Sequence, residues 1–226
     1  MPEFSIHPSK RLVELFNRKP YQGANPETAS ILILGNDANY SEEISSHPFF
    51  ESILEYHEDG VSFWQKYGVH HPFLLSDYPF NKTAGGVPYH RKVSKLGFNP
   101  DFAVKVSFVE LLDVPTIGNA TQNMKTFYEL LNPDHLRWLE SLIYSDQYKF
   151  VLINRTLIKE VSKISRFHGV LTKLNSDIQR SSQEILVDED NLTLYKGYSF
   201  SASQCSNNYL ENLSVLIKSK LEYHRA

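Results

Sequence analysis

The residues best suited to chemistry follow an apolar run early in the chain. Residues 30–35, SILILG, are typical of a strand that is covered on both faces, and Asn36, Asp37 and Asn39 come directly after it. A carboxylate at the end of a strand can accept a proton from water or stabilise a developing positive charge. The same spacing suits a carboxylate that caps a following helix, so the pattern leaves Asp37 with two interpretations.

Two more candidates come from other predicted elements. Residues 102–112 predict a second buried strand that carries Glu110, and residues 89–97 predict a helix that begins at Tyr89 and ends at Gly97. A Tyr89 ring facing a cavity would stack on a nucleic-acid base, whereas a ring turned inward would only fill the core. Glu110 would contact a substrate, or would be a buried acid satisfied by the backbone or Arg91.

Alternating strands and helices position these residues. Besides the two strands above, apolar runs predict strands at 149–154 and 198–203 and a hairpin at 184–197. Amphipathic patterns predict helices at 8–20, at 47–68 with a break near Gly60, and at 123–131, 133–145, 155–165 and 207–223. This alternation predicts an α/β fold, a three-layer α/β/α arrangement around a mostly parallel sheet. Such sheets bind ligands at the carboxyl ends of their strands.

Composition limits the classes of protein that fit. The chain has 226 residues, 41% of them hydrophobic and 22% charged, which suits one globular domain over 1–226. The net charge of −3 gives no overall basic field, so nucleic-acid binding would need a local patch. One cysteine, Cys205, excludes an internal disulfide and a zinc ribbon. We expect no leader and no membrane span, and an intracellular, cytoplasmic protein.

Four segments, in chain order, resemble the motifs of the uracil-DNA glycosylase superfamily, most closely its mismatch-specific uracil/thymine branch. Residues 35–39, GNDAN, parallel the Gly-x-Asn-Pro-Gly turn of that branch, with Asp37 at the catalytic position. GNDANY is also similar to the Gly-Gln-Asp-Pro-Tyr-His turn of the ordinary uracil enzymes. The other three segments are YHRKVSKLGF (89–98), VSFVELLDVPT (106–116) and SFSASQCSNN (199–208).

The resemblance implies a monomeric DNA glycosylase that flips a base out of DNA and needs no metal or organic cofactor. It implies that Asp37 activates or orients water and that four residues contact the base: Asn36, Asn39, Tyr89 and Glu110. It implies DNA contacts from His90, Arg91, Ser201, Ser203, Gln204 and Asn207. The serines are equally typical of helix caps, and the basic helix residues of a solvated surface.

The chain departs from the family pattern in ways that affect the substrate. Ala38 replaces a proline, Gln204 replaces a wedge arginine, and an insertion at about 41–88 precedes the helix. Glu110 stands where the thymine branch has a base-reading asparagine. An ionised carboxylate accepts hydrogen bonds only, so it suits the N4 amine of cytosine and repels O4 of uracil. A protonated Glu110 would bond to N3 of cytosine or assist its departure.

These departures favour a modified cytosine, for example glucosylated hydroxymethylcytosine, in phage DNA entering a bacterium. Three alternatives remain: repair of uracil or mismatched thymine, a non-catalytic module that binds nucleic acid, and hydrolysis of free nucleosides. The pair His70–His71 does not indicate a metal site, because adjacent side chains in an extended loop point apart and no spaced partner completes the ligand set. Loop packing, or contact with a DNA phosphate or sugar, fits this pair better.

Overall fold

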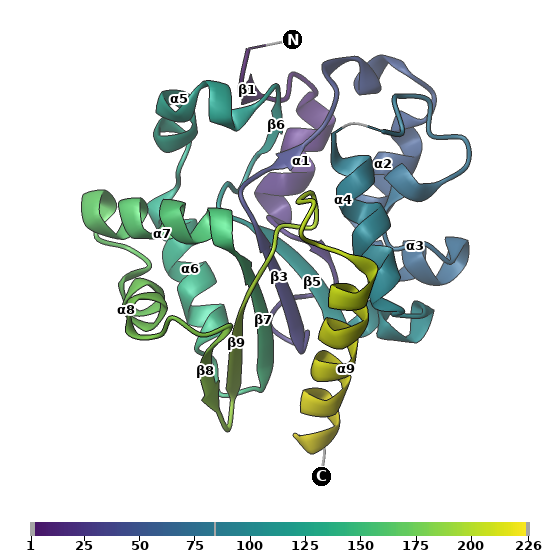
Figure 1. The fold of residues 1–226 in the computed structure, drawn as a ribbon. Coiled ribbons are helices and arrows are strands. Elements are labelled where there is room, and N and C mark those ends of the chain that lie inside the picture. Colours follow the sequence, from purple (N-terminus) through teal and green to yellow (C-terminus); the bar gives the residue numbers. More distant parts are fainter. Residues whose placement is uncertain (1–2, 84, 225–226) are drawn as a thin grey trace.

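The computed structural model, which describes residues 3–83 and 85–224, has a six-stranded sheet at its centre (Figure 1). Four central strands run parallel, and each edge strand is antiparallel to its neighbour. The prediction of a mostly parallel sheet is confirmed. In order across the sheet, the strands are β2 (Gln22–Gly23), β5 (Val106–Glu110), β3 (Ile31–Gly35), β7 (Lys149–Asn154), β9 (Leu192–Gly197) and β8 (Ile185–Glu189).

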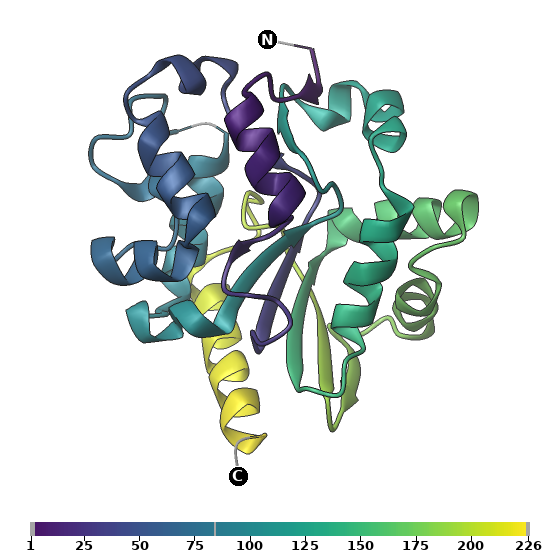
Figure 2. The same cartoon turned by 180° about the vertical axis from the view of Figure 1, so that it is seen from behind.

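Helices cover both faces of this sheet, which confirms the three-layer α/β/α prediction. Leu32 and Leu34 enter one core and Ile31 and Ile33 the other, because successive side chains of a strand point to opposite faces. Helix α9 lies on the near side in Figure 1, and α6 lies on the near side in the reverse view of Figure 2. The first core holds α5 (Met124–Glu129), α6 (Pro133–Ile143), α7 (Arg155–His168) and α8 (Thr172–Arg180). The second holds α3 (Gly60–Tyr67), α4 (Gly86–Val93) and α9 (Asn207–Tyr223).

A third, smaller core lies beside the sheet, where α1 (Lys10–Arg18) packs on α2 (Phe50–Glu58). Much of the expected insertion at 41–88 belongs to it, including the one-turn helices η1 (Glu42–Ser46) and η2 (Pro72–Leu74). A short sheet of β1 (Ser5–Ile6), β6 (Pro115–Ile117) and β4 (Ala38–Asn39) joins this region to the chain that follows β3.

Several element boundaries differ from the sequence predictions. Helix α4 begins at Gly86, before Tyr89, and continues through a one-turn helix, η3 (Ser94–Leu96), to Gly97, whose φ of 66° is left-handed as expected of a helix terminator. The second strand is shorter than 102–112, because the one-turn helix η4 (Pro100–Lys105) precedes it. Helix α8 has no counterpart among the predictions.

The strand predicted at 198–203 is wrong. This segment forms turns, in which the amide of Ala202 donates to Ser199 O and the amide of Cys205 donates to Ala202 O. Both edges of β9 are already paired, with β7 and with β8, so the segment that follows cannot pair with β9. No helix among residues 3–83 and 85–224 has the length and apolar character needed to cross a membrane.

Candidate active site

A cavity of about 260 Å³ opens at the carboxyl ends of β3 and β5, where the sequence places its candidate residues. Its lining comes from the turn after β3, the end of β5, the start of α4, the segment at 71–73 and the Ser-rich turns after β9. Seven of the predicted site residues line it: Asn36, Asp37, Asn39, Tyr89, His90, Glu110 and Ser201. Four do not: Arg91, Ser203, Gln204 and Asn207.

A glycine makes room for the second acid. Gly35 pairs with Glu110 in the parallel register of β3 and β5. A Cβ atom at position 35 would lie 1.8 Å from Oε2 of Glu110, so the carboxyl group occupies the space that any other residue would fill. The backbone continues this pairing beyond the strand, since the amide of Leu111 donates to Gly35 O and that of Leu112 to Asn36 O.

Asp37 is held by side chains and does not cap a helix. The hydroxyl of Thr116 donates to its Oδ2 at 2.5 Å, and Asn39 Nδ2 lies 3.4 Å from the same oxygen. The Asn39 amide is fixed in turn by Gly118 O at 2.9 Å. Ser41 precedes the next helical turn, so the capping interpretation is wrong. Among the described residues no hydrogen bond reaches Oδ1, which leaves that oxygen for water or substrate.

Burial governs the protonation of both acids. It raises the pKa of Asp37, against the two hydrogen bonds that favour the carboxylate. Burial, with a smaller contribution from the nearby charge of Asp37, raises the pKa of Glu110 to about 8. With a pKa of about 8, Glu110 is mostly protonated near neutral pH.

The Glu110 carboxyl group is not paired with the backbone of the described residues or with Arg91, as the interpretation of a purely structural acid required. Among the described residues no hydrogen bond or ion pair reaches its carboxyl group, and Arg91 is exposed outside the cavity. In the same cavity lining, Oδ1 of Asn36 is fully buried and also lacks a hydrogen-bond partner within the described chain. Unpaired buried polar groups are costly, and a ligand with matching donors would satisfy both.

Aromatic rings form the other side of the cavity. The Tyr89 ring is half-buried and lies edge-on to Phe200, with 5.3 Å between the ring centres. It thus combines the two interpretations, because it packs on the second core and also lines the cavity. Phe73 and Phe108 add two buried rings to the lining.

The histidines differ from their predictions. His90 was expected on a basic DNA-binding surface, but it is buried, and its ring stacks on His71 with 3.6 Å between centres. Burial holds the pKa of His90 well below its usual value, so the ring is uncharged. The side chains of His70 and His71 were expected to point apart, yet both contact His90: His70 Nε2 lies 3.1 Å from His90 Nδ1. His71 also accepts the Phe73 amide at the start of η2.

The Ser-rich turns are fixed by a lysine from α4. Lys92 Nζ donates to Ala202 O at 3.0 Å and to Cys205 O at 2.6 Å, so it is not a member of a solvated basic surface. Ser206 caps α9 by accepting the Tyr209 amide, which leaves Ser201 at the cavity and Ser203 exposed. Beyond the cavity, Gln204 is exposed, and Asn207 accepts a hydrogen bond from Lys95.

Sequence reasoning missed several lining residues, among them Gln22, His71, Phe73, Phe108 and Asn154. Two of them carried a usable signal. Phe108 lies two residues before Glu110 on a strand, so both point to the same face. Asn154 ends the third parallel strand and so obeys the same strand-end rule that selected Asp37, although its Oδ1 also caps α7.

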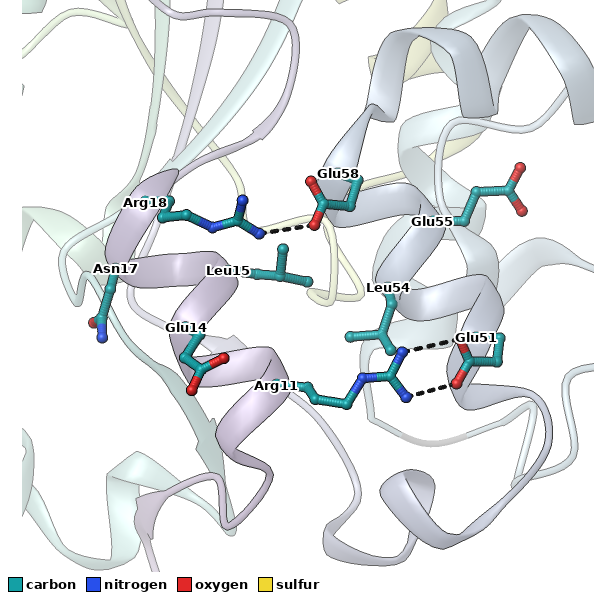
Figure 3. A pocket seen from close by; sticks show the side chains of 9 residues that line it. All are labelled: Arg11, Glu14, Leu15, Asn17, Arg18, Glu51, Leu54, Glu55 and Glu58. Atoms are coloured by element: carbon teal, nitrogen blue, oxygen red, sulfur yellow. Dashed lines mark hydrogen bonds and ion pairs between the residues drawn. The ribbon is translucent and has the colours of Figure 1, made fainter.

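A larger hollow of about 820 Å³ lies between α1 and α2, but its polar groups are largely engaged with one another (Figure 3). Arg11 spans it to Glu51 with two hydrogen bonds, and Arg18 reaches Glu58 at 2.8 Å. These pairs are exposed and contribute little stability each. The cavity at the strand ends, with its unpaired polar atoms, is the stronger candidate.

The described part of the chain contains no group of three or more His, Cys, Asp or Glu residues arranged to hold a metal ion. Comparison of the chain with protein-family models, with curated proteins and with solved structures gave no match.

Proposed function

We propose that the protein is a DNA glycosylase, which hydrolyses the bond between deoxyribose and a flipped, modified cytosine and leaves an abasic site. One observation carries the proposal. Asp37 and Glu110, two acids whose pKa values are raised by burial, that of Glu110 to about 8, line the same cavity at the strand ends, together with the ring of Tyr89. Neighbouring titratable groups with perturbed pKa values are typical of acid and base catalysis.

The two acids divide the chemistry of hydrolysis. Ionised Asp37 stabilises the positive charge that develops on the sugar and takes a proton from the attacking water. The new bond joins the water oxygen to C1′, while the C1′–N1 bond breaks and its electrons pass to the base. Protonated Glu110 gives its proton to N3, so the base leaves neutral. No cofactor is required for this sequence of proton transfers.

The neutral carboxyl of Glu110 refines the choice of base. Its O–H donates to N3 and its carbonyl accepts from the N4 amine, which matches the edge of cytosine. A neutral acid can also pair with uracil, so hydrogen bonding alone does not separate the two. Cytosine is the poorer leaving group, however, and gains more from a proton donor. Asn36 Oδ1 offers a further acceptor for an exocyclic amine.

In this proposal DNA is the macromolecular partner, and Ser201 with the neighbouring backbone contacts phosphates beside the flipped nucleotide. The protein acts inside a bacterial cell, on the modified cytosines of incoming phage DNA. Residues 71–73 and 85–86, which belong to the insertion at about 41–88, supply part of the cavity wall.

A gel assay tests the proposal. Oligonucleotides carrying uracil, mismatched thymine, 5-hydroxymethylcytosine or its glucosylated form are incubated with the protein and cleaved with alkali at abasic sites. We expect cleavage of the modified-cytosine strands and a loss of about 100-fold or more in Asp37→Asn. Asp146→Asn, an exposed change between α6 and β7, is the matched control.

Each contrary result has a distinct meaning. Full activity of Asp37→Asn would remove the mechanism. Cleavage of uracil strands with little effect of Glu110→Asn would favour the repair alternative. DNA binding without any abasic product would indicate a non-catalytic module, and release of bases from free nucleosides would remove DNA as the substrate.

A further inference from the structure

A second hollow of about 460 Å³ adjoins the base cavity. The two share Asn39, Tyr40, Phe73, Gly85 and Gly86 in their lining, so the two spaces lie against each other. We call this space, between the η1 segment and residues 78–81, the outer hollow. Its volume lies within the range of about 300–1,000 Å³ typical of small-molecule sites.

One side of the outer hollow is aromatic. Phe80 lies edge-on to Tyr78, with 5.8 Å between ring centres, and Tyr78 contacts Phe73 at 4.9 Å. Phe80 is half-buried, although Phe73 and Tyr78 are buried. A half-buried ring beside a hollow offers an apolar surface for the C–H groups of a ligand.

The other side presents donors and acceptors together. The side-chain oxygens of Asn81 and Asn119 are engaged locally, by Thr83 and by Thr121, so each amide has its NH₂ group left to donate. Glu42 and Glu43 are exposed carboxylates and can only accept. A hydroxyl group both donates and accepts, so a ligand rich in hydroxyls can pair with both kinds of group at once.

The negative charge of the outer hollow makes a DNA phosphate an unsuitable occupant. Among the described residues no ion pair neutralises Glu42 or Glu43. Two unpaired carboxylates repel a phosphate, so the hollow is unsuited to the backbone of DNA. An uncharged ligand with several hydroxyls and an apolar face fits the aromatic side, the polar side and the charge.

We infer that the outer hollow is a carbohydrate subsite, which holds a hexose carried at C5 of the base in the inner cavity. The inference rests on the proposed glycosylase function and adds the residues that read the substituent. Phe80 packs on the sugar ring, Asn81 and Asn119 donate to its hydroxyls, and Glu42 and Glu43 accept from them. Asp37 and Glu110 act on the bond to deoxyribose and do not touch the hexose.

The test compares two substrates that differ only in the hexose. Single-turnover rates and KM are measured on 5-hydroxymethylcytosine DNA and on its glucosylated form, for the wild type, for Phe80→Ala and for the double variant Glu42→Gln/Glu43→Gln. We expect each variant to lose about tenfold or more in kcat/KM on glucosylated DNA and to stay within about twofold of the wild type on hydroxymethylcytosine DNA. Glu14→Gln on α1, also exposed and outside the lining of the hollow, is the control for charge.

The outcomes separate this inference from the function on which it rests. Equal losses on the two substrates, or no loss on either, would overturn the subsite and leave the glycosylase intact. Failure of the wild type to form abasic sites on any substrate would overturn both. Because the glutamine variants remove no packing, they keep the test valid if circular dichroism shows that Phe80→Ala does not fold.

Discussion

Replacement of Glu110 by glutamine tests the protonation state on which the proposed chemistry depends. Glutamine keeps the size of the side chain and removes its titration. In the folded protein burial raises the pKa of Glu110 from the usual 4.5 to about 8. Folding then favours the protonated acid. As the pH rises from the pKa of Glu110 in the unfolded chain to its pKa in the folded protein, this group progressively destabilises the fold, and above the folded pKa the destabilisation stays constant.

The size of the effect follows from the two pKa values. A shift of one unit corresponds to about 1.4 kcal/mol, and between about pH 5 and about pH 9 the linkage amounts to at most about 4 kcal/mol. Water in the open cavity screens the carboxylate and reduces the figure. Titrating groups that do not interact with Glu110 are the same in both proteins, so their contributions cancel when the variant is compared with the wild type.

Urea unfolding at the two pH values measures this difference. We expect the wild type to lose up to about 4 kcal/mol more of its free energy of unfolding than Glu110→Gln on going to the higher pH, and the variant to be the more stable protein there. Glu14→Gln should follow the wild type. An equal pH dependence in the wild type and in Glu110→Gln would mean that Glu110 is ionised at neutral pH in the fold, and its role as proton donor would be refuted.

Three further outcomes are expected. The pH profile of kcat/KM should rise as Asp37 ionises, at a pKa above its usual value, and fall near pH 8 as Glu110 loses its proton; Glu110→Gln should lack the alkaline fall. Gly35→Ala should displace the Glu110 carboxyl and lower kcat by about tenfold or more, which steady-state rates on modified-cytosine DNA would measure; an unchanged rate would show that the carboxyl position is unimportant. Lys92→Met should loosen the turns at 199–206, seen as faster hydrogen exchange there, while Arg91→Met on the exposed face of the same helix should leave exchange unchanged.

The sequence by itself determined the layers of the fold and the end of the sheet at which the candidate residues lie. Uninterrupted apolar runs such as 31–34 and 149–153 identify strands covered on both faces, and helical periods between them require a parallel sheet. Since parallel strands end at the same edge of a sheet, the pattern also predicts that Asp37 and Glu110 lie together, as they do in the cavity. These inferences depend on local periodicity, which a single sequence displays directly.

The tertiary structure decided what surrounds those two acids. That His90 is buried and uncharged depends on His70 and His71, which reach it from a loop about twenty residues away in the chain. The partner of Asp37 is Thr116, which the short side sheet brings to it from far along the sequence. The protonation and burial of these groups, and the shape of the outer hollow, arise from contacts between segments that are distant in the chain. No local sequence pattern encodes such contacts, because each depends on how separate elements pack.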